Sequence, residues 1–336
     1  MLARPRTIAG VSLVSHRAII GPGERWMLCL CGSQVRIFSC STGQLHSVLE
    51  ETTEAADRLT ALVFNPVNPH SQIYTATVSG SILLWDYEDG VLVKKVTSKY
   101  PLHGLYVPYR DRGLFLLSEH TERRSSVGSA KDLANRPEDE SCALFQLDCI
   151  GDISKGSKGR LVCRSLSTDS TKVAFCSRGE YLASINHNSL NIYYFKDEHF
   201  KKHLISRNLF TCIAVHPTEQ CIATGDTQGR ILLWRNFQEA PTVSKTTVHW
   251  HSTAVLDIAF SLEGSYMWSG GWESTLVQWS LNNTDQKDFI PRLGAAIVRL
   301  SISYDGNIIA VSHSDGGITF ISILIERTNS TLSIHS

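Results

Sequence analysis

The chain has 336 residues, of which 42% are hydrophobic, and this is enough to form a substantial buried core. Its 32 Lys and Arg residues balance 32 Asp and Glu residues, so no whole-molecule charge draws it to nucleic acid or to a membrane. No run of about 18 apolar residues occurs, which predicts no membrane span, and the nine scattered cysteines are typical of free thiols in a reducing compartment.

A unit of three strands joined by tight turns, often ending in Trp, recurs along the chain. It is clearest between Phe210 and Trp234. The third strands are predicted to end near Phe38, Trp85, Phe145, Tyr193, Trp234, Trp279 and Ile321. These ends lie 41–48 residues apart, with one interval of 60 residues after Trp85. A period of about 40–45 residues is typical of four-stranded propeller blades. Residues 1–325 are therefore predicted to form an all-β, seven-bladed WD40 β-propeller, and residues 326–336 a flexible tail.

The second unit shows the strand pattern in detail. Its predicted strands are Leu59–Phe64, Ile73–Val78, Ile82–Tyr87 and Val91–Val96. Each is a short run rich in β-branched and aromatic residues. Asn68-Pro69 and Ser79-Gly80 separate them as turns, because Pro fixes φ near a turn value and Gly reaches positive φ freely. No window keeps the apolar i, i+3, i+4 spacing for three turns, so helices are predicted to be nearly absent.

The two ends of the repeat array are predicted to meet. A single blade cannot bury both faces of its sheet, so the blades are expected to stack in a ring, which also covers strand edges. The last unit shows no convincing fourth strand after Ile323. The apolar segment Ile8–Val14 precedes the first unit, and we predict that it pairs with the last blade and closes the ring.

Two segments interrupt the regular spacing. Glu119–Ser141 is charged and Ser-rich, which predicts a mobile loop, and Gly151–Ser170 is rich in Gly, Ser and basic residues. Together they suggest a local basic surface for RNA or a protein partner. Its candidate contact residues are Arg123, Arg124, Lys155, Lys158 and Arg160, with Lys131 and Arg164 nearby. The alternative is solvated loop charge, offset by the acidic residues at 138–140.

No motif predicts catalysis or a cofactor. Gly151 to Lys158 imitates a phosphate-binding loop, but the Lys is one place late and no helix follows. His249-Trp250-His251 could present two imidazoles on one face of a strand, yet no further metal ligand is evident nearby. We interpret His251 instead as the structural His that precedes the first strand of many WD repeats. We predict a chain that is not an enzyme and that holds no cofactor or metal.

Many WD repeats join that His, a turn Asp, a strand hydroxyl and the Trp in one hydrogen-bond network. Only fragments of this network are expected here, because Asp315 occupies the turn position in the seventh unit, whereas Ser79, Gln228 and Glu273 occupy it elsewhere. The third and fourth units depart furthest from the repeat pattern.

Several segments together resemble a known family. They are Phe210 to Gly225, Gly229 to Phe237, His249-Trp250-His251, Asp257 to Phe260, Gln72 to Gly90 and Val35 to Phe38. They are similar to the nucleolar WD-repeat family of WD repeat-containing protein seventy-five. The likeness runs along nearly the whole chain and is most specific at Trp234-Arg-Asn-Phe237 and at the His-Trp-His segment. Members of that family are longer and carry a second propeller and a tail.

The resemblance implies a non-catalytic scaffold of the small-subunit processome, located in the nucleus and nucleolus. It implies partners among other WD-repeat subunits of the subcomplex linked to pre-rRNA transcription, and the 5′ external spacer of pre-rRNA as a further contact. It also implies support of transcription by RNA polymerase I and of early 18S rRNA processing. A generic WD40 adaptor, such as a ubiquitin-ligase substrate receptor, is the alternative function. No membrane partner is expected.

Overall fold

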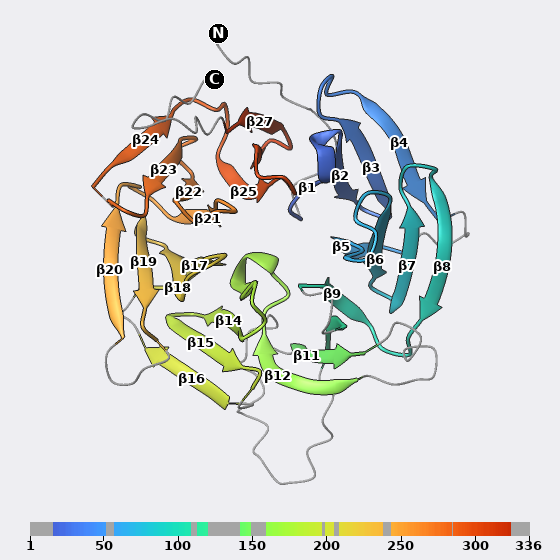
Figure 1. The fold of residues 1–336 in the computed structure, drawn as a ribbon, viewed down its shortest axis with the longest axis horizontal. Helices are drawn as coiled ribbons and strands as arrows, with labels where there is room; N and C mark the ends of the chain where they lie inside the picture. The colour runs from blue at the N-terminus through green and yellow to red at the C-terminus, as the bar shows by residue number, and fades with distance from the viewer. Residues whose placement is uncertain are drawn as a thin grey trace.

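The computed structural model describes residues 16–51, 57–108, 113–119, 142–148, 159–196, 199–204, 208–237, 243–283 and 285–323, with the backbone alone for 199–204. Seven antiparallel sheets stand around a common centre, with the first strands innermost and the fourth strands outermost (Figure 1). The described residues contain two 3-10 turns and no α-helix, and so no helix that could cross a membrane. The predicted all-β, seven-bladed propeller is confirmed.

The first three sheets follow the chain without crossovers. Blade 1 has β1 (Ile19–Ile20), the 3-10 turn η1 (Pro22–Glu24), β2 (Trp26–Cys31), β3 (Gln34–Ser39) and β4 (Leu45–Glu50). Blade 2 has β5 (Leu59–Phe64), β6 (Gln72–Thr77), β7 (Ser81–Asp86) and β8 (Val91–Thr97). Blade 3 has β9 (Leu102–Tyr106), β10 (Leu114–Glu119), β11 (Cys142–Leu147) and β12 (Arg160–Leu166).

The remaining sheets repeat this order, except that the described part of blade 7 has three strands. Blade 4 has the 3-10 turn η3 (Ser170–Lys172), β13 (Val173–Phe175), β14 (Tyr181–Asn186), β15 (Ser189–Tyr194) and β16 (His199–Leu204). Blade 5 has β17 (Phe210–Val215), β18 (Cys221–Asp226), β19 (Arg230–Arg235) and β20 (Ser244–His249). Blade 6 has β21 (Val255–Phe260), β22 (Tyr266–Gly271), β23 (Leu276–Ser280) and β24 (Lys287–Ile290). Blade 7 has β25 (Ile297–Ile302), β26 (Ile308–His313) and β27 (Ile318–Ser322).

The hydrophobic core is divided among the interfaces between neighbouring blades. Seven buried clusters occur, and each combines side chains of two adjacent blades. Strand alternation explains this, because successive side chains point to opposite faces of a sheet. In β22, Met267 packs toward blade 5 and Trp268 toward blade 7. Each blade therefore depends on both neighbours for its burial.

The ring is closed between blades 7 and 1. Ile318 and Ala310 of blade 7 pack with Met27 and Ile20 of blade 1. Polar contacts join the first turns of the same blades: the Glu24 carboxylate accepts hydrogen bonds from the Ser303 hydroxyl at 2.5 Å and the Asn307 backbone N–H at 3.1 Å. The predicted closing strand Ile8–Val14 and the predicted tail lie outside the described residues.

The described part of the segment 151–170 differs from its sequence interpretation, whereas residues 151–158 lie outside the described ranges. Arg160–Leu166 is not part of an interrupting loop but forms β12, the outer strand of blade 3. It pairs with β11 through two register shifts, and Ser165 has a positive φ of 61°. The shifts break strict alternation, which hid the strand in the sequence. Of the predicted loop 119–141, Glu119 belongs to β10 and the other residues lie outside the described part.

Candidate functional site

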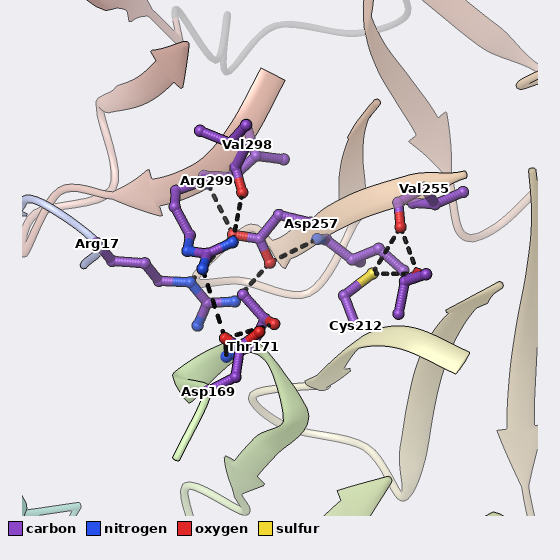
Figure 2. A network of polar contacts seen from close by, with 11 residues as sticks. Arg17, Asp169, Thr171, Cys212, Val255, Asp257, Val298 and Arg299 are labelled. Carbon is purple, nitrogen blue, oxygen red and sulfur yellow. Dashed lines mark hydrogen bonds and ion pairs between the residues drawn. The ribbon is translucent and has the colours of Figure 1, made fainter. Parts of the chain in front are cut away.

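The first strands of the blades lie nearest the centre of the ring (Figure 1), and polar side chains gather in this central region, which we call the channel (Figure 2). Arg17 approaches the channel from the segment before β1 and binds Asp257 on β21. Its Nε and Nη2 donate to the two carboxylate oxygens at 3.0 and 2.5 Å. The Asp257 side chain is 0% exposed, whereas that of Arg17 is 30% exposed. The pair ties blade 6 to a segment that lies 240 residues earlier in the chain.

The Asp257 carboxylate also joins two blades. It accepts the backbone N–H of Ile258 at 2.9 Å and that of Leu300, on β25 of blade 7, at 2.8 Å. Register shifts between Val255 and Asp257, and at the matching place in β25, alter the backbone pairing beside these contacts. The buried charge thus has four donors, which satisfies the requirement that a buried carboxylate be paired and hydrogen-bonded.

A second acid lies across the channel, at the start of η3. Asp169 Oδ1 caps η3 by accepting the backbone N–H and the hydroxyl of Thr171 at 2.9 and 2.8 Å. Arg299 of β25 reaches the same oxygen at 3.5 Å and donates to the Val298 carbonyl at 2.9 Å. Figure 2 shows the two arginines and the two aspartates around one space. The network therefore links blades 4, 6 and 7 with the chain before blade 1.

Burial shifts the pKa values of three groups in or beside the channel. Burial is the main cause that lowers the pKa of His16, and the charges of Arg58 and Arg299 lower it further. Burial raises the pKa of the Cys212 thiol and of the Tyr106 phenol, so both keep their protons. The shifts of Cys212 and Tyr106 are the opposite of those that activate a nucleophile.

The prediction that only fragments of the WD hydrogen-bond network remain is wrong for blade 6. His251 Nε2 lies 2.8 Å from Ser269 Oγ, which also accepts the Trp279 indole N–H at 2.9 Å. His251 Nδ1 lies 3.3 Å from Glu273, which replaces the usual Asp. The longer Glu side chain reaches the same ring from the turn after β22. Blade 6 therefore has the complete network.

His249 and His251 make separate hydrogen bonds. His249 Nε2 lies 3.2 Å from the Gln228 carbonyl, whereas both nitrogens of His251 are occupied within blade 6. No group of three or more possible metal ligands occurs in the described ranges.

Beside the hydrogen-bond network of blade 6, Trp272 is 58% exposed. Exposed Trp is a residue type enriched where proteins bind one another.

Only one of the five predicted contact residues can be placed. Arg160 is exposed at the start of β12 and lies 3.5 Å from the side-chain oxygen of Gln146 on β11. Arg123, Arg124, Lys155 and Lys158 lie outside the described residues, so the basic surface stays a prediction.

The channel network was missed by sequence reasoning. One signal was available: Asp257 and Arg299 are single charges within otherwise apolar or small-residue strands, Val255–Phe260 and Ile297–Ile302. A charge in a buried strand requires a partner. The partner Arg17 could not be found this way, because it lies far away in the sequence and outside any strand.

The comparison with known proteins agrees with this architecture. The family model for the first β-propeller of WD repeat-containing protein 75 matches residues 19–316. This chain belongs to the WD repeat-containing protein 75 family. It is 34% identical to WD repeat-containing protein 75 of Danio rerio over 328 residues and 33% identical to that of Homo sapiens over 338 residues. These alignments cover 93% and 95% of the chain but 37% and 38% of the relatives.

The chain therefore spans little more than a third of the length of these relatives. It is also similar to U3 small nucleolar RNA-associated protein 17 of Schizosaccharomyces pombe, at 29% identity over 99 residues. That match covers 30% of the chain and 12% of the relative. As in the matched family model, the chain contains the first propeller of the family architecture.

Proposed function

We propose that this propeller is a non-catalytic scaffold in ribosome biogenesis. The observation that supports it most is the family match across residues 19–316. The fission yeast relative adds weight, since its name associates it with the U3 small nucleolar RNA. The channel chemistry agrees, because its acids and cations bind one another and its thiol and phenol keep their protons.

The proposed mechanism is to hold partners in a fixed geometry. Seven blade interfaces and the channel network make a rigid ring, so its turns and outer strands keep constant separations. Within the small-subunit processome, we propose contacts with WD-repeat subunits linked to pre-rRNA transcription. The finer functions are support of RNA polymerase I and of early 18S rRNA processing, in the nucleolus.

The proposal is tested by purifying the tagged chain from cells and sedimenting the extract. We expect a nucleolar signal, co-sedimentation with large pre-ribosomal particles and co-purification of processome proteins. Depletion should cause 18S precursors to accumulate and should reduce nascent pre-rRNA in a run-on assay. Recovery of ubiquitin-ligase subunits without processome proteins would instead support the adaptor function and overturn this proposal.

Direct contact with the 5′ external spacer of pre-rRNA is a separate part of the proposal. It rests on the basic residues Arg123, Arg124, Lys155, Lys158 and Arg160, of which Arg160 is exposed on the outer strand of blade 3. Replacing Lys155, Lys158 and Arg160 with Glu should reduce crosslinking to pre-rRNA at least about tenfold, because phosphate contacts depend strongly on charge.

A matched control reverses three other charges, with Lys94→Glu, Lys99→Glu and Arg178→Glu, all at exposed positions on blades 2 and 4. This control should keep its crosslinking. Equal crosslinking by both triple variants and the wild type would remove RNA contact from the proposal, while the protein contacts would stand.

A further inference from the structure

The outer edge of blade 7 has no neighbouring strand within the described part of the chain. Six sheets have four strands, whereas the sheet of blade 7 ends at β27. An unpaired edge presents a row of backbone N–H and C=O groups to which a further strand can bind. Residues 1–15 precede the described chain and residues 324–336 follow it, so either end is long enough to supply that strand.

The fourth strands of the other blades share one buried position. It lies opposite the residue three places before the repeat Trp or its replacement, and it packs toward the next blade. In blades 1, 2 and 5 it is held by Leu49, Val96 and Val248, at 2%, 5% and 6% exposure. In blade 7, Ile321 takes the place of the Trp, so the matching residue of the third strand is Ile318. Ile318 is 0% exposed and packs with blade 1, so a fourth strand on β27 is expected to place an aliphatic side chain at this junction.

Blade 1 shows the surface that such a side chain would cover. Leu45 on β4 lies opposite Phe38, which packs toward blade 7, yet Leu45 is 51% exposed. Leu92 holds the same position on β8 of blade 2, but it is partly buried against the cluster that contains Leu49 of blade 1. Leu92 thus has the fourth strand of the preceding blade beside it, whereas no described strand lies in that place for Leu45.

The spacing of the chain identifies the residue that fills this place. The first residue after a first strand donates its backbone N–H to the carbonyl five places later. In blade 1 this residue is Gly21, and in blades 5, 6 and 7 it is His216, Ser261 and Ser303. Thirteen places before the last three lie the fourth-strand residues at the shared position, His203, Val248 and Ile290. Three consecutive junctions have the same length, and thirteen places before Gly21 lies Ile8.

The sequence before Ile8 suits this register. In the same alignment, Pro5 matches Lys287 of β24. The Ser280 N–H donates to the Gln286 carbonyl at 3.1 Å, and hydrogen bonding alternates along an antiparallel pair, so the Lys287 N–H points away from β23. Pro has no N–H to donate and is tolerated on an edge strand at such a place.

The C-terminal segment is the other candidate. Leu332 lies 14 residues after Ile318, which is the spacing between the paired positions of the third and fourth strands in blades 1 and 2. A strand there would require a tight turn at residues 323–326, which are Ile, Leu, Ile and Glu. The matching turn of blade 2 has the Asp86 carboxylate as acceptor for two backbone N–H groups and Gly90 at a φ of 71°. The N-terminal segment requires no such turn, because it does not follow β27 in the chain.

We propose that Arg4–Ala9 binds the open edge of β27 as the fourth strand of blade 7, with Ile8 opposite Ile318. This register differs from the strand Ile8–Val14 expected from the sequence, because Ile8 comes near the end of the strand and residues 10–15 connect it to the channel. The added strand joins blades 7 and 1 by backbone hydrogen bonds as well as by side-chain packing, and Ile8 covers Leu45.

Disulfide trapping tests the register on the purified 336-residue chain, without RNA or partners, so its outcome is independent of the proposed function. Opposite residues of an antiparallel pair have Cα atoms about 4.5–5.5 Å apart, which a disulfide can span. Phe320→Cys is combined in turn with Arg6→Cys, Ser12→Cys and Ser330→Cys. In the proposed register Arg6 lies opposite Phe320, whereas Ser12 lies six residues, or about 20 Å, further along. Ser330 would lie opposite Phe320 if the C-terminal segment formed the strand.

After oxidation, mass spectrometry of the digested chain identifies the crosslinked peptides and separates them from those of the native cysteines. We expect the pair at positions 6 and 320 to crosslink at least about tenfold faster than the other two pairs. Faster crosslinking of the pair with Ser12→Cys would show another register, and that of the pair with Ser330→Cys would show a C-terminal strand. Either result, or equally slow crosslinking of all three pairs, would overturn the proposal.

Hydrogen exchange provides a second measurement that needs no crosslink. Ile8→Asp would place a carboxylate in an apolar junction, so it should release the strand and speed amide exchange in β27 at least about tenfold. The thermal midpoint should fall by about 3 °C or more. Leu2→Asp is the matched control, because Leu2 lies outside the proposed strand, and it should exchange like the wild type. Equal exchange in the two variants would contradict the role given to Ile8.

Discussion

Replacing Arg17 with an uncharged residue should lower the stability of the whole propeller, although Arg17 lies before the first blade. Arg17→Met removes two charge-assisted hydrogen bonds to Asp257 and keeps most of the aliphatic volume. Such bonds are worth about 1.5–3 kcal/mol each, and removing one partner of a buried pair costs about 3–5 kcal/mol. Asp257 would keep two backbone donors, and the 30% exposure of Arg17 gives water access to the site. We therefore expect the lower end, about 3 kcal/mol.

Urea unfolding followed by Trp fluorescence measures this loss. With an m-value of about 3 kcal/mol/M, the midpoint should fall by about 1 M. Arg178→Met is the control, because the exposed Arg178 has no hydrogen bond or ion pair to a described residue, and it should stay within about 0.5 kcal/mol of the wild type.

Combining Arg17→Met with Asp257→Asn separates the ion pair from other effects. The double variant should lose less stability than the sum of the two single variants, by at least about 1 kcal/mol, since the second change removes the charge left unpaired by the first. Strict additivity, or an Arg17→Met midpoint equal to that of Arg178→Met, would refute the assigned role of the pair.

Three further predictions concern the ring. Burial lowers the pKa of His251 below 6.5. At Glu273, hydrogen bonds outweigh burial and lower the pKa to about 2. Below pH 6.5, the unfolded chain therefore binds more protons than the native chain. The urea midpoint should therefore fall steadily from about pH 7 to about pH 4, and a constant midpoint would contradict this. Glu24→Ala removes the hydrogen-bond acceptor for Ser303 where blades 1 and 7 meet, and it should lower the free energy of unfolding by about 1–3 kcal/mol. The loss should appear as faster hydrogen exchange in β25 and β26. Unchanged exchange there would show that this contact does not stabilise the junction of the two blades. Deleting residues 1–14 should lower the thermal midpoint if they complete blade 7, and normal stability would exclude that closure.

The repeat made most of the fold predictable. A strand ending in Trp at 85, 234 and 279 fixes the position of a blade, because the indole N–H needs a hydroxyl from the second strand, such as Thr75 for Trp85. Alternation of side chains along each strand then requires two packing partners for every sheet. Together, these local patterns determined seven blades in a ring.

The central site could not be predicted from local sequence patterns. Arg17, Asp169, Asp257 and Arg299 come from separate elements, and no spacing in the chain relates them. The strand Arg160–Leu166 of blade 3 was also not predicted, because register shifts in its pairing with the neighbouring strand made its sequence resemble that of a loop.

Local sequence thus determined which segments form strands, since turn chemistry and strand alternation act over a few residues. The meeting of Arg17 with Asp257 was decided only when ring closure brought residues 240 positions apart into contact. The energy of a buried charge depends on the partners that surround it in space, and a linear pattern does not contain them.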